Sequence, residues 1–498
     1  MDEFKYVIGQ TMGAWPTGQR RPRLDVMTTQ RSLLSRGREG LRRAWAELNT
    51  SLRGEAAWSL APDLPDNDLA FLRDRVRACV AMSGAEYARR AEATRIGHAY
   101  AALTATGRTR FLRLLGTEFG ADESTIDTAI EAWRASRSPA ARTALRESLS
   151  SPRLRLLTLL NSLPEGIKFL VDMRGATLDV AGQDEALGEV ERDLKHLLHG
   201  WFDVGFLQLR RIDWHTPAAF LEKLIEYEAV HEITSWQDLK HRLASDRRLY
   251  AVVHPNMPDE PLIFVQVALC RDLAGNVQTL LDTDGSFTPP EEADTAIFYS
   301  ISNAQRGLAG ISFGNHLIRR VVNDLKQELP GLRQFATLSP IPGFAHWLGT
   351  LLAERPDPGG RAGLHEAERQ LLQGTAHPDW HRDPPLAAAL QPLLSRLCAR
   401  YLNETAPRKR QARDPVAHFH LGNGASIARL NWMADASAKG LTQSFGMMVN
   451  YLYDPREIDA NSEPDSRSAQ IACARALRDN PGRRRWPWQA RPDDAAAP

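Results

Sequence analysis

The sequence predicts two domains of different fold class, a helical bundle over residues 31–190 and a mixed α/β domain over residues 191–460. Apolar residues recur at helical spacing throughout the first part. Short runs rich in β-branched and aromatic residues begin only in the second part, where turns separate them. The length of 498 residues also exceeds what one ordinary hydrophobic core supports, so two domains are expected.

The helical half begins after an N-terminal arm. Residues 1–30 mix Gly, Pro and Arg without a repeating apolar face, so we expect this arm to be disordered. Within residues 31–190, Gly and Pro punctuate the helical pattern, and Asp122 or Ser124 is expected to cap the helix TIDTAIEAWRAS. Because no cluster of His, Cys or carboxylates at ligand spacing occurs here, we interpret this half as a scaffold or oligomerisation domain.

Strand character appears in the second half. The runs RLYAVVHP and PLIFVQVALC flank the turn-forming NMPDE, which predicts a β-hairpin, and TAIFYSIS predicts a third strand. Further along, the stretch from DPVAHFHLGNG to MMVNYLYD shows strand-like alternation interrupted by turns. The core pattern ends near Arg478, so residues 478–498 are expected to be a disordered tail.

The most informative stretch is the one between Thr295 and Phe344. The strand TAIFYSIS is followed by the glycine loop NAQRGLAGISFGN and the helix HLIRRVVNDLKQEL, and a second strand is expected over residues 332–338. A strand, glycine loop and helix in this order can hold an anion at the helix N-terminus. The glycine spacing matches neither GxGxxG nor the P-loop, which argues against both of these nucleotide sites. A glycine loop without a ligand remains the alternative.

Composition excludes several classes of function. The net charge is +1 and arginines are interleaved with acidic residues, so the charge pattern gives no reason to expect nucleic-acid binding. No apolar run approaches the roughly 20 residues that cross a bilayer, so no membrane segment is expected. The opening MDEFKYVIGQ lacks the pattern of a secretory signal, and DDAAAP is not a peroxisomal address. Four cysteines without a CxxC pair indicate a reducing compartment and predict a cytoplasmic protein.

Three side chains are candidates for chemistry. Ser339 lies at the end of a predicted strand before Pro-Ile-Pro-Gly, where rigid prolines would fix its hydroxyl, although a serine before proline is usually only part of a turn. His418 and His420 would share one face of a strand, so they are candidate metal ligands, but no third ligand is visible nearby. His420 alone is a candidate proton donor. Tyr453 could line a pocket or pack in the core.

Several unusual segments, in this order, closely resemble the malonyl-CoA decarboxylase family over roughly residues 194–453. They are HPNMPDEPLIFVQVAL, AIFYSISNAQRGLAGISFGNHLIRRVV, TLSPIPGF, DPVAHFHLGNG, RLNWMADASAKGL and MMVNYLY. The resemblance implies a helical domain used in oligomerisation and a catalytic domain with a GNAT-like fold.

The resemblance also implies the site. It places the catalytic serine of the SPIPGF motif at Ser339, the catalytic histidine of the FHLxNG motif at His420, and a substrate-binding tyrosine at Tyr453. The loop that contacts coenzyme A falls on Ala309, Gly310, Ile311, Ser312, Phe313, Gly314 and Asn315. Some family members carry an acidic residue in this loop where the present chain has Ser312, so a loop carboxylate has no counterpart at that position.

The expected activity is the conversion of malonyl-CoA to acetyl-CoA and CO2, in fatty acid metabolism, by a Ser/His pair without metal or organic cofactor. The expected partners are the substrate malonyl-CoA and further copies of the same chain, as a dimer or tetramer formed through the helical domain. Two alternatives are a GNAT-like acyltransferase that moves an acyl group from coenzyme A to an amine, and a non-catalytic scaffold that binds coenzyme A.

Overall fold

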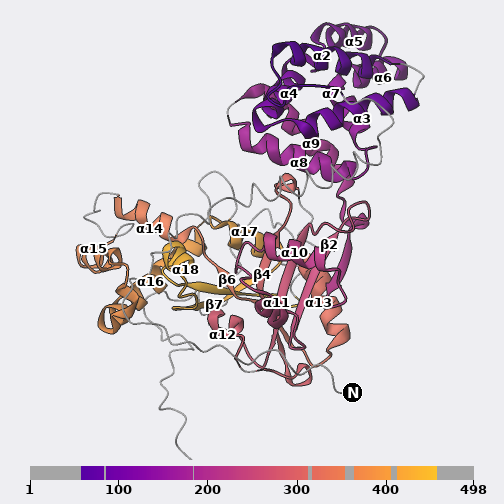
Figure 1. Cartoon of the computed structure of the whole chain (residues 1–498). Coiled ribbons are helices and arrows are strands. Elements are labelled where there is room, and N and C mark those ends of the chain that lie inside the picture. The colour runs from indigo at the N-terminus through magenta and orange to yellow at the C-terminus, as the bar shows by residue number, and fades with distance from the viewer. Residues whose placement is uncertain are drawn as a thin grey trace, which may run out of the picture. The chain divides into compact units, whose positions relative to one another are not determined.

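The computed structural model describes residues 58–82, 86–182, 184–285, 287–311, 317–353, 364–404 and 412–456 (Figure 1). The predicted arm at residues 1–30, the start of the predicted bundle at residues 31–57 and the predicted tail at residues 478–498 lie outside these ranges.

The first described part is helical, as predicted. Its helices are α2 (Asp66–Ala81), α3 (Glu86–Ala102), α4 (Ala105–Glu118), α5 (Glu123–Ser136), α6 (Pro139–Ser148), α7 (Pro152–Leu160), α8 (Gly166–Val180) and α9 (Glu185–Trp201). The predicted cap of α5 is confirmed, because the Asp122 side chain accepts a hydrogen bond from the Thr125 backbone N–H at 2.9 Å.

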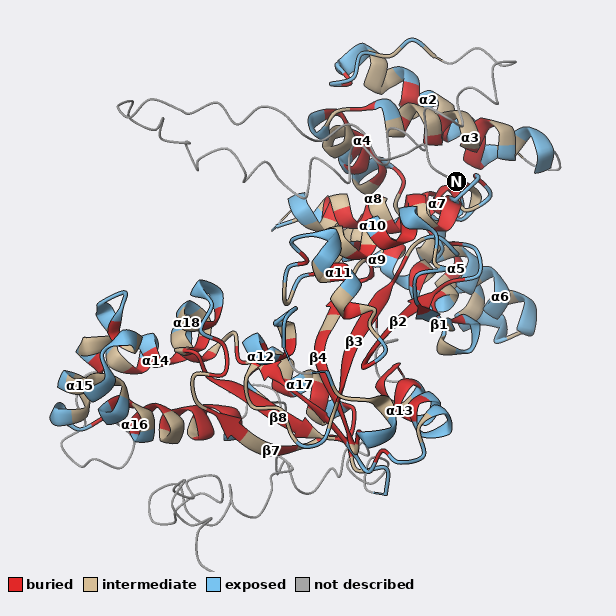
Figure 2. Ribbon diagram, turned by 60° about the horizontal axis from the view of Figure 1, so that its bottom comes forward, coloured by how far each residue is buried: buried red, intermediate tan, exposed pale blue. Residues whose placement is uncertain are grey.

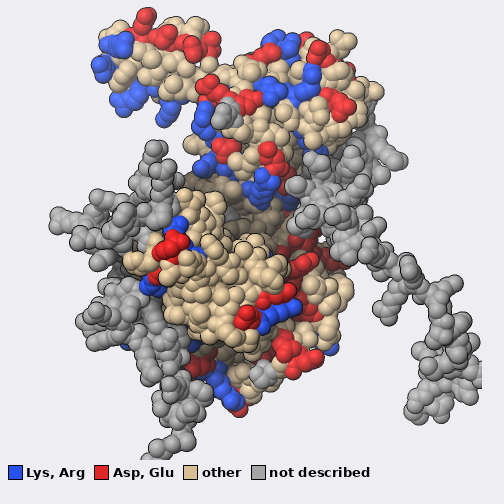
Figure 3. Space-filling view, turned by 90° about the vertical axis from the view of Figure 1, so that its left-hand side faces the viewer, with Lys and Arg blue, Asp and Glu red and all other residues tan. Residues whose placement is uncertain are grey.

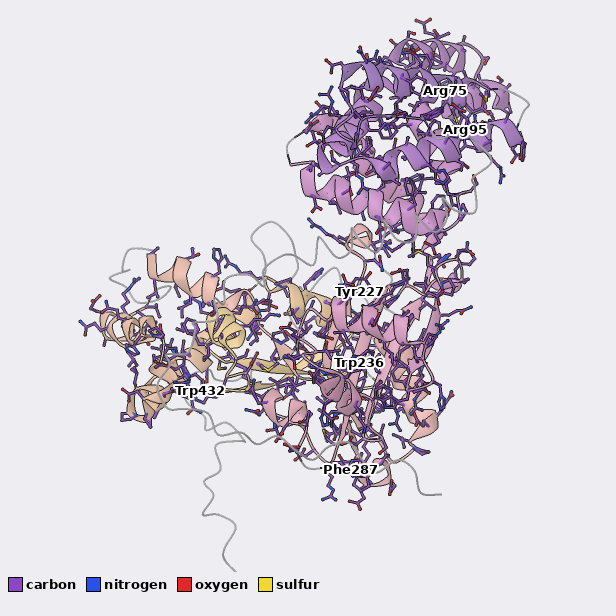
Figure 4. All side chains as sticks on the ribbon, viewed as in Figure 1. Arg75, Arg95, Tyr227, Trp236, Phe287 and Trp432 are labelled. Carbon is purple, nitrogen blue, oxygen red and sulfur yellow. The ribbon has the colours of Figure 1, made fainter. Side chains whose placement is uncertain are left out.

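A buried carboxylate joins two of these helices. Glu92 on α3 is only 3% exposed and pairs with Arg75 of α2 and with Arg95 one turn further along α3. Figure 4 labels both arginines within the helical part. A buried charge needs such partners, since an unpaired carboxylate loses its hydration without compensation. The pairings therefore fix α2 against α3.

The second part is built on an eight-stranded mixed sheet. Its strands are β1 (Gln208–Ile212), β2 (Arg247–Val253), β3 (Ile263–Cys270), β4 (Thr295–Asn303), β5 (Gln334–Thr337), β6 (Ser339–Pro340), β7 (Ser426–Asn431) and β8 (Met448–Leu452). The order is β1-β2-β3-β4-β5-β8-β6, and β7 also pairs with β8. The predicted hairpin is confirmed, because β2 and β3 pair antiparallel across the NMPDE turn.

Helices cover both faces of the first strands. Leu249 and Ala251 of β2 pack in one hydrophobic cluster with Leu221 of α10 (Ala218–Tyr227), and α11 (Trp236–Arg242) joins this layer. Tyr250 points to the opposite face, where its hydroxyl donates to Asp324 of α13 (Leu317–Glu328) at 2.6 Å. Strands β2, β3 and β4 are buried along nearly their whole length (Figure 2). This two-sided burial explains why these runs are continuously apolar.

The predicted strands and the helix between them are confirmed, whereas residues 312–315 of the predicted glycine loop lie outside the described residues. β4 and β5 are parallel and are connected through the glycine loop and α13. Their pairing runs from Thr295 with Gln334 to Phe298 with Thr337, after which β4 continues alone beside β3. Ser339 follows two residues after the last pair. The chain thus has a helical region followed by a mixed α/β domain, as expected.

The C-terminal part of the sheet is surrounded by further helices. They are α12 (Val277–Leu281), α14 (Phe344–Ala353), α15 (Glu366–Gln373), α16 (Pro384–Asn403), α17 (Pro415–Gly422) and α18 (Ala438–Ser444). The strand-like alternation expected from DPVAHFHLGNG onward is wrong at its start, since residues 415–422 form helix α17. Asp414 caps this helix and Pro415 occupies its first position, a combination that favours helix initiation over a strand.

The start of the glycine loop is held by helix α8. Gly307 packs so tightly against α8 that a Cβ atom there would lie 1.8 Å from the Val171 carbonyl oxygen. The Arg174 guanidinium donates to the carbonyl oxygens of Gly307 at 2.5 Å and Ala309 at 2.8 Å. Only glycine fits this approach, so α8 sets the path along which the chain leaves β4.

We therefore expect Gly307→Ala to destabilise the protein by about 1–3 kcal/mol, the usual range for overpacking. The Val171 carbonyl is backbone and cannot move aside cheaply. Thermal denaturation of the purified variant measures the change. Gly349→Ala is the control, since nothing lies within 4 Å of a Cβ at this position on α14. A melting temperature for Gly307→Ala equal to that of the control would contradict the tight contact.

Candidate active site

Ser339 occupies the two-residue strand β6, which pairs with β8 through Ser339–Val449 and Pro340–Met448. The serine is 5% exposed, and its hydroxyl donates to Thr337 Oγ1 at 2.8 Å. The ladder on one side and Pro340 on the other leave the hydroxyl little freedom. Ser339 is thus a fixed, buried hydroxyl at the point where β4 and β5 stop pairing.

His420 lies in the last turn of α17 and is 3% exposed. Its Nε2 is 3.1 Å from Ser339 Oγ, and its Nδ1 is 2.7 Å from the Tyr453 hydroxyl. Three side chains that the sequence singled out, Ser339, His420 and Tyr453, are therefore in one hydrogen-bonded row.

Each group in this row donates a hydrogen bond to the next, from Tyr453 through His420 and Ser339 to Thr337. Because the single hydroxyl proton of Ser339 goes to Thr337, the proton between Ser339 and the imidazole belongs to His420 Nε2. In a neutral ring Nδ1 is then an acceptor, and Tyr453 donates to it. This arrangement gives the site a histidine N–H donor aimed at a serine oxygen. It is not the arrangement of a serine activated as a nucleophile, which would need Nε2 free to accept.

Aromatic rings enclose the imidazole. The Tyr451 ring stacks on it with centroids 4.6 Å apart, and the Phe419 ring meets it edge-on at 5.1 Å. Tyr451 and Tyr453 are both fully buried on or next to β8. Burial lowers the pKa of His420 from its usual 6.5 to about 3, because an imidazolium here would lose its hydration without a carboxylate partner. His420 is therefore neutral at physiological pH.

The candidate pair of metal ligands, His418 and His420, does not form. His418 and His420 lie two residues apart on a helix, about 200° around its axis rather than on one face. His418 is exposed, whereas His420 is buried. Within the described ranges, no group of three or more His, Cys, Asp or Glu side chains has a geometry that could hold a metal ion.

The candidate loop for coenzyme A is described only in part. Ala309, Gly310 and Ile311 follow the 3-10 turn η3 (Arg306–Leu308), and Gly310 has a φ of +71°, which favours glycine. Ser312, Phe313, Gly314 and Asn315 lie outside the described residues. The three described residues belong to the segment after β4 and are not part of the hydrogen-bonded row at Ser339.

Two residues of the site were missed by sequence reasoning. Thr337 accepts from the Ser339 hydroxyl and, at 3.1 Å, from the Tyr451 backbone N–H, so it joins β5 to β8 beside the site. Its position two residues before Ser339 on the same strand face was the available signal. Tyr451 lies two residues before Tyr453 and had the same signal.

The surface of the described part carries both signs of charge. Acidic and basic side chains are interspersed on the face drawn in Figure 3. Among the described residues, no helix combines the length and the hydropathy needed to cross a membrane.

Comparisons with known proteins agree with the predicted resemblance. A family model described as the malonyl-CoA decarboxylase C-terminal domain matches residues 205–490, and one described as the N-terminal domain matches residues 119–202. Mitochondrial malonyl-CoA decarboxylase of Anser anser anser is 38% identical over 383 residues, which are 71% of this chain and 76% of the relative.

Two solved structures show the same similarity along nearly their whole length. Malonyl-CoA decarboxylase from Rhodopseudomonas palustris is 42% identical with a TM-score of 0.78, over 82% of this chain and 99% of that chain. The protein of the same name from Agrobacterium vitis is 41% identical with a TM-score of 0.77, over 82% of this chain and 98% of that chain.

The lowered pKa of His420 predicts an acid-sensitive fold. Above pH 6.5 the imidazole is neutral in both the folded and the unfolded chain. Below pH 6.5, His420 binds a proton in the unfolded chain, whereas in the folded chain it stays neutral down to about pH 3. Stability therefore falls as the pH drops. At pH 5 this contribution is about 2 kcal/mol. His420→Asn should therefore lose less stability than wild type between pH 7 and pH 5, as measured by chemical denaturation.

The exposed His418→Asn variant controls for the loss of an imidazole and should follow the wild-type pH dependence. An identical loss of stability in wild type and His420→Asn would show that His420 titrates normally in the folded protein.

Proposed function

Because this chain belongs to the malonyl-CoA decarboxylase family and is thus a carboxy-lyase, we propose that it converts malonyl-CoA to acetyl-CoA and CO2 at Ser339 and His420. The observation that carries this assignment of residues is the row of hydrogen bonds from Tyr453 through His420 to Ser339. It presents two fixed donors in a buried site, which is what the reaction requires.

The chemistry needs little beyond positioning. When the bond between the carboxylate carbon and the methylene carbon breaks, CO2 leaves and the electron pair moves through the methylene carbon to the thioester oxygen. The resulting enolate then takes one proton on carbon, which gives acetyl-CoA. The thioester carbonyl is itself the electron sink, so the reaction calls for no organic cofactor. The protein has to orient the carboxylate and stabilise the charge on the enolate oxygen.

His420 Nε2–H is suited to the enolate oxygen. It is a neutral donor held in place by Tyr453, and it meets the developing charge by exchanging its hydrogen bond to Ser339 Oγ for one to the enolate oxygen. Passing its proton to carbon would draw the Tyr453 proton onto Nδ1 and leave a buried tyrosinate. Burial raises the pKa of Tyr453 well above its usual value, which opposes that transfer. We therefore assign enolate stabilisation to His420 and delivery of the carbon proton to solvent.

Ser339 is suited to the substrate carboxylate or thioester oxygen. Its oxygen is fixed, but its proton, which goes to Thr337 in the absence of substrate, can turn to a substrate oxygen by rotation about the Cβ–Oγ bond. Residues Ala309 to Asn315 are proposed to bind coenzyme A. Tyr453, first expected to contact substrate, is proposed to hold the histidine, since its hydroxyl is committed to Nδ1.

Two further properties belong to the proposal. Homo-oligomerisation through the helical half, as a dimer or tetramer, follows from the family resemblance, and analytical ultracentrifugation tests it. A cytoplasmic location follows from the cysteine pattern, although the relative from Anser anser anser is named as mitochondrial. Cell fractionation decides between the two compartments.

We expect His420→Asn and Ser339→Ala each to lower turnover by about 10²-fold, the scale for losing one aligned catalytic donor. The assay measures acetyl-CoA and CO2 released from malonyl-CoA with no acceptor amine present. His418→Asn is the matched control and should retain wild-type turnover.

Wild-type rates in both site variants would remove these residues from the mechanism. Release of free coenzyme A with transfer of the acyl group to an added amine, and without CO2, would indicate an acyltransferase. Binding of coenzyme A without turnover in the wild-type protein would indicate a scaffold.

A further inference from the structure

The carboxylate of Asp414 contacts two segments that carry the proposed catalytic pair. It is fully buried, and its two oxygens accept different sets of hydrogen bonds. Oδ1 accepts from the backbone N–H groups of Val416 at 2.9 Å and Ala417 at 3.0 Å, which caps helix α17. Oδ2 accepts from the Tyr401 hydroxyl at 3.1 Å and from the Gly343 backbone N–H at 3.4 Å.

Through Oδ1, Asp414 is connected to the helix that carries His420. α17 has only eight residues, and His420 lies in its last turn, so the position of the helix N-terminus sets the position of the imidazole. The C-terminal end of α17 is also fixed, because the backbone N–H of Ala425 donates to the His420 carbonyl at 3.1 Å.

Through Oδ2, Asp414 is connected to the turn that follows Ser339. Gly343 lies four residues after Ser339, with Pro340 and Pro342 stiffening the segment between them. The turn has no room for a side chain at Gly343, since a Cβ would lie 2.1 Å from the Tyr401 hydroxyl oxygen. The Tyr401 ring packs against Phe344, with centroids 5.9 Å apart, which holds the hydroxyl in place. A displaced Gly343 would therefore move the turn that follows Ser339.

We propose that Asp414 is a positioning residue of the reaction, which sets the distance between Ser339 and His420 by joining α17 to the turn at Gly343. This inference rests on the proposed function, and it goes further by naming a residue that does not touch substrate. Of its two oxygens, Oδ1 caps helix α17, and Oδ2 aligns this helix with the turn at Gly343. The two roles can therefore be separated by substitution.

Asp414→Asn makes that separation. The asparagine oxygen still caps α17, because Asn is as good a cap as Asp. Its amide group replaces Oδ2 and cannot accept from Gly343 or from Tyr401, so both Oδ2 hydrogen bonds are lost while the cap is kept. Tyr401→Phe removes the other donor to Oδ2 and keeps the ring packing. Asp383→Asn is the control, since Asp383 caps α16 through the Leu386 N–H alone and is exposed.

The experiment measures kcat and KM for malonyl-CoA, with the number of active sites counted by calorimetric titration with acetyl-CoA. Asp414→Asn should lower kcat per site by about 10- to 100-fold, the scale of a small misalignment. Its KM should change by less than about threefold, since uniform binding is retained. Tyr401→Phe should lower kcat in the same direction by less, and Asp383→Asn should match wild type.

A kcat per site in Asp414→Asn within about twofold of wild type would overturn the proposal, because a cap that only supports folding lowers the number of sites and not their rate. A wild-type protein that releases no CO2 overturns the proposed function instead. In that case NMR of the 15N-labelled protein decides the structural claim. The signal measured is the imidazole Nε2–H of His420, which is assigned by its absence in His420→Asn. It should shift or be lost in Asp414→Asn and persist in Asp383→Asn, and an unchanged signal in Asp414→Asn would overturn the proposal.

Discussion

The hydrogen bond between Ser339 Oγ and His420 Nε2 joins two segments that are 81 residues apart in the sequence. One partner lies on the short strand β6, and the other lies on a helix that leads into β7. Strand β8 holds the two segments together, since it pairs with β5, β6 and β7. β8 and the residue that follows it also supply Tyr451 and Tyr453. The site thus depends on one strand that arrives near the end of the described chain.

Burial determines what this histidine can do. A charged imidazole surrounded by tyrosine and phenylalanine rings would lose its hydration and gain no counter-charge, so the neutral form persists. A neutral N–H donor can stabilise an enolate oxygen, and in a site with little water its hydrogen bond is strong. The same burial opposes ionisation of Tyr453. The site is therefore suited to stabilising charge that develops on a substrate rather than to shuttling protons through its own side chains.

Much of this could be predicted from the sequence. The run from Thr295 to Leu338 gives the parallel strands and their connecting helix, because periodicity and glycine punctuation are local signals. Ser339 before two prolines also stands out locally. Its pairing with His420 does not, since the intervening residues form helices α14 to α16 and their register with the sheet is set by tertiary packing. That pairing came from the family resemblance.

The wrong prediction of a strand at residues 415–422 has a physical cause. The alternation in HFH suggests a strand, but Asp414 and Pro415 begin a helix there, and capping outweighs a three-residue pattern. Asp414 was overlooked for a related reason. One of its oxygen atoms accepts a hydrogen bond from the backbone of Gly343, 71 residues away in the sequence, which no spacing rule reveals.

The pH dependence of kcat for malonyl-CoA decarboxylation in the wild-type protein tests most directly whether His420 acts in catalysis as a neutral imidazole. With a pKa of about 3, the imidazole does not change its charge between pH 5 and pH 8, so kcat should show no inflection from it in that range. The profile of His420→Asn, at its lower rate, should then run parallel to that of wild type. An inflection near pH 6.5 that is present in wild type and absent in His420→Asn would contradict this account.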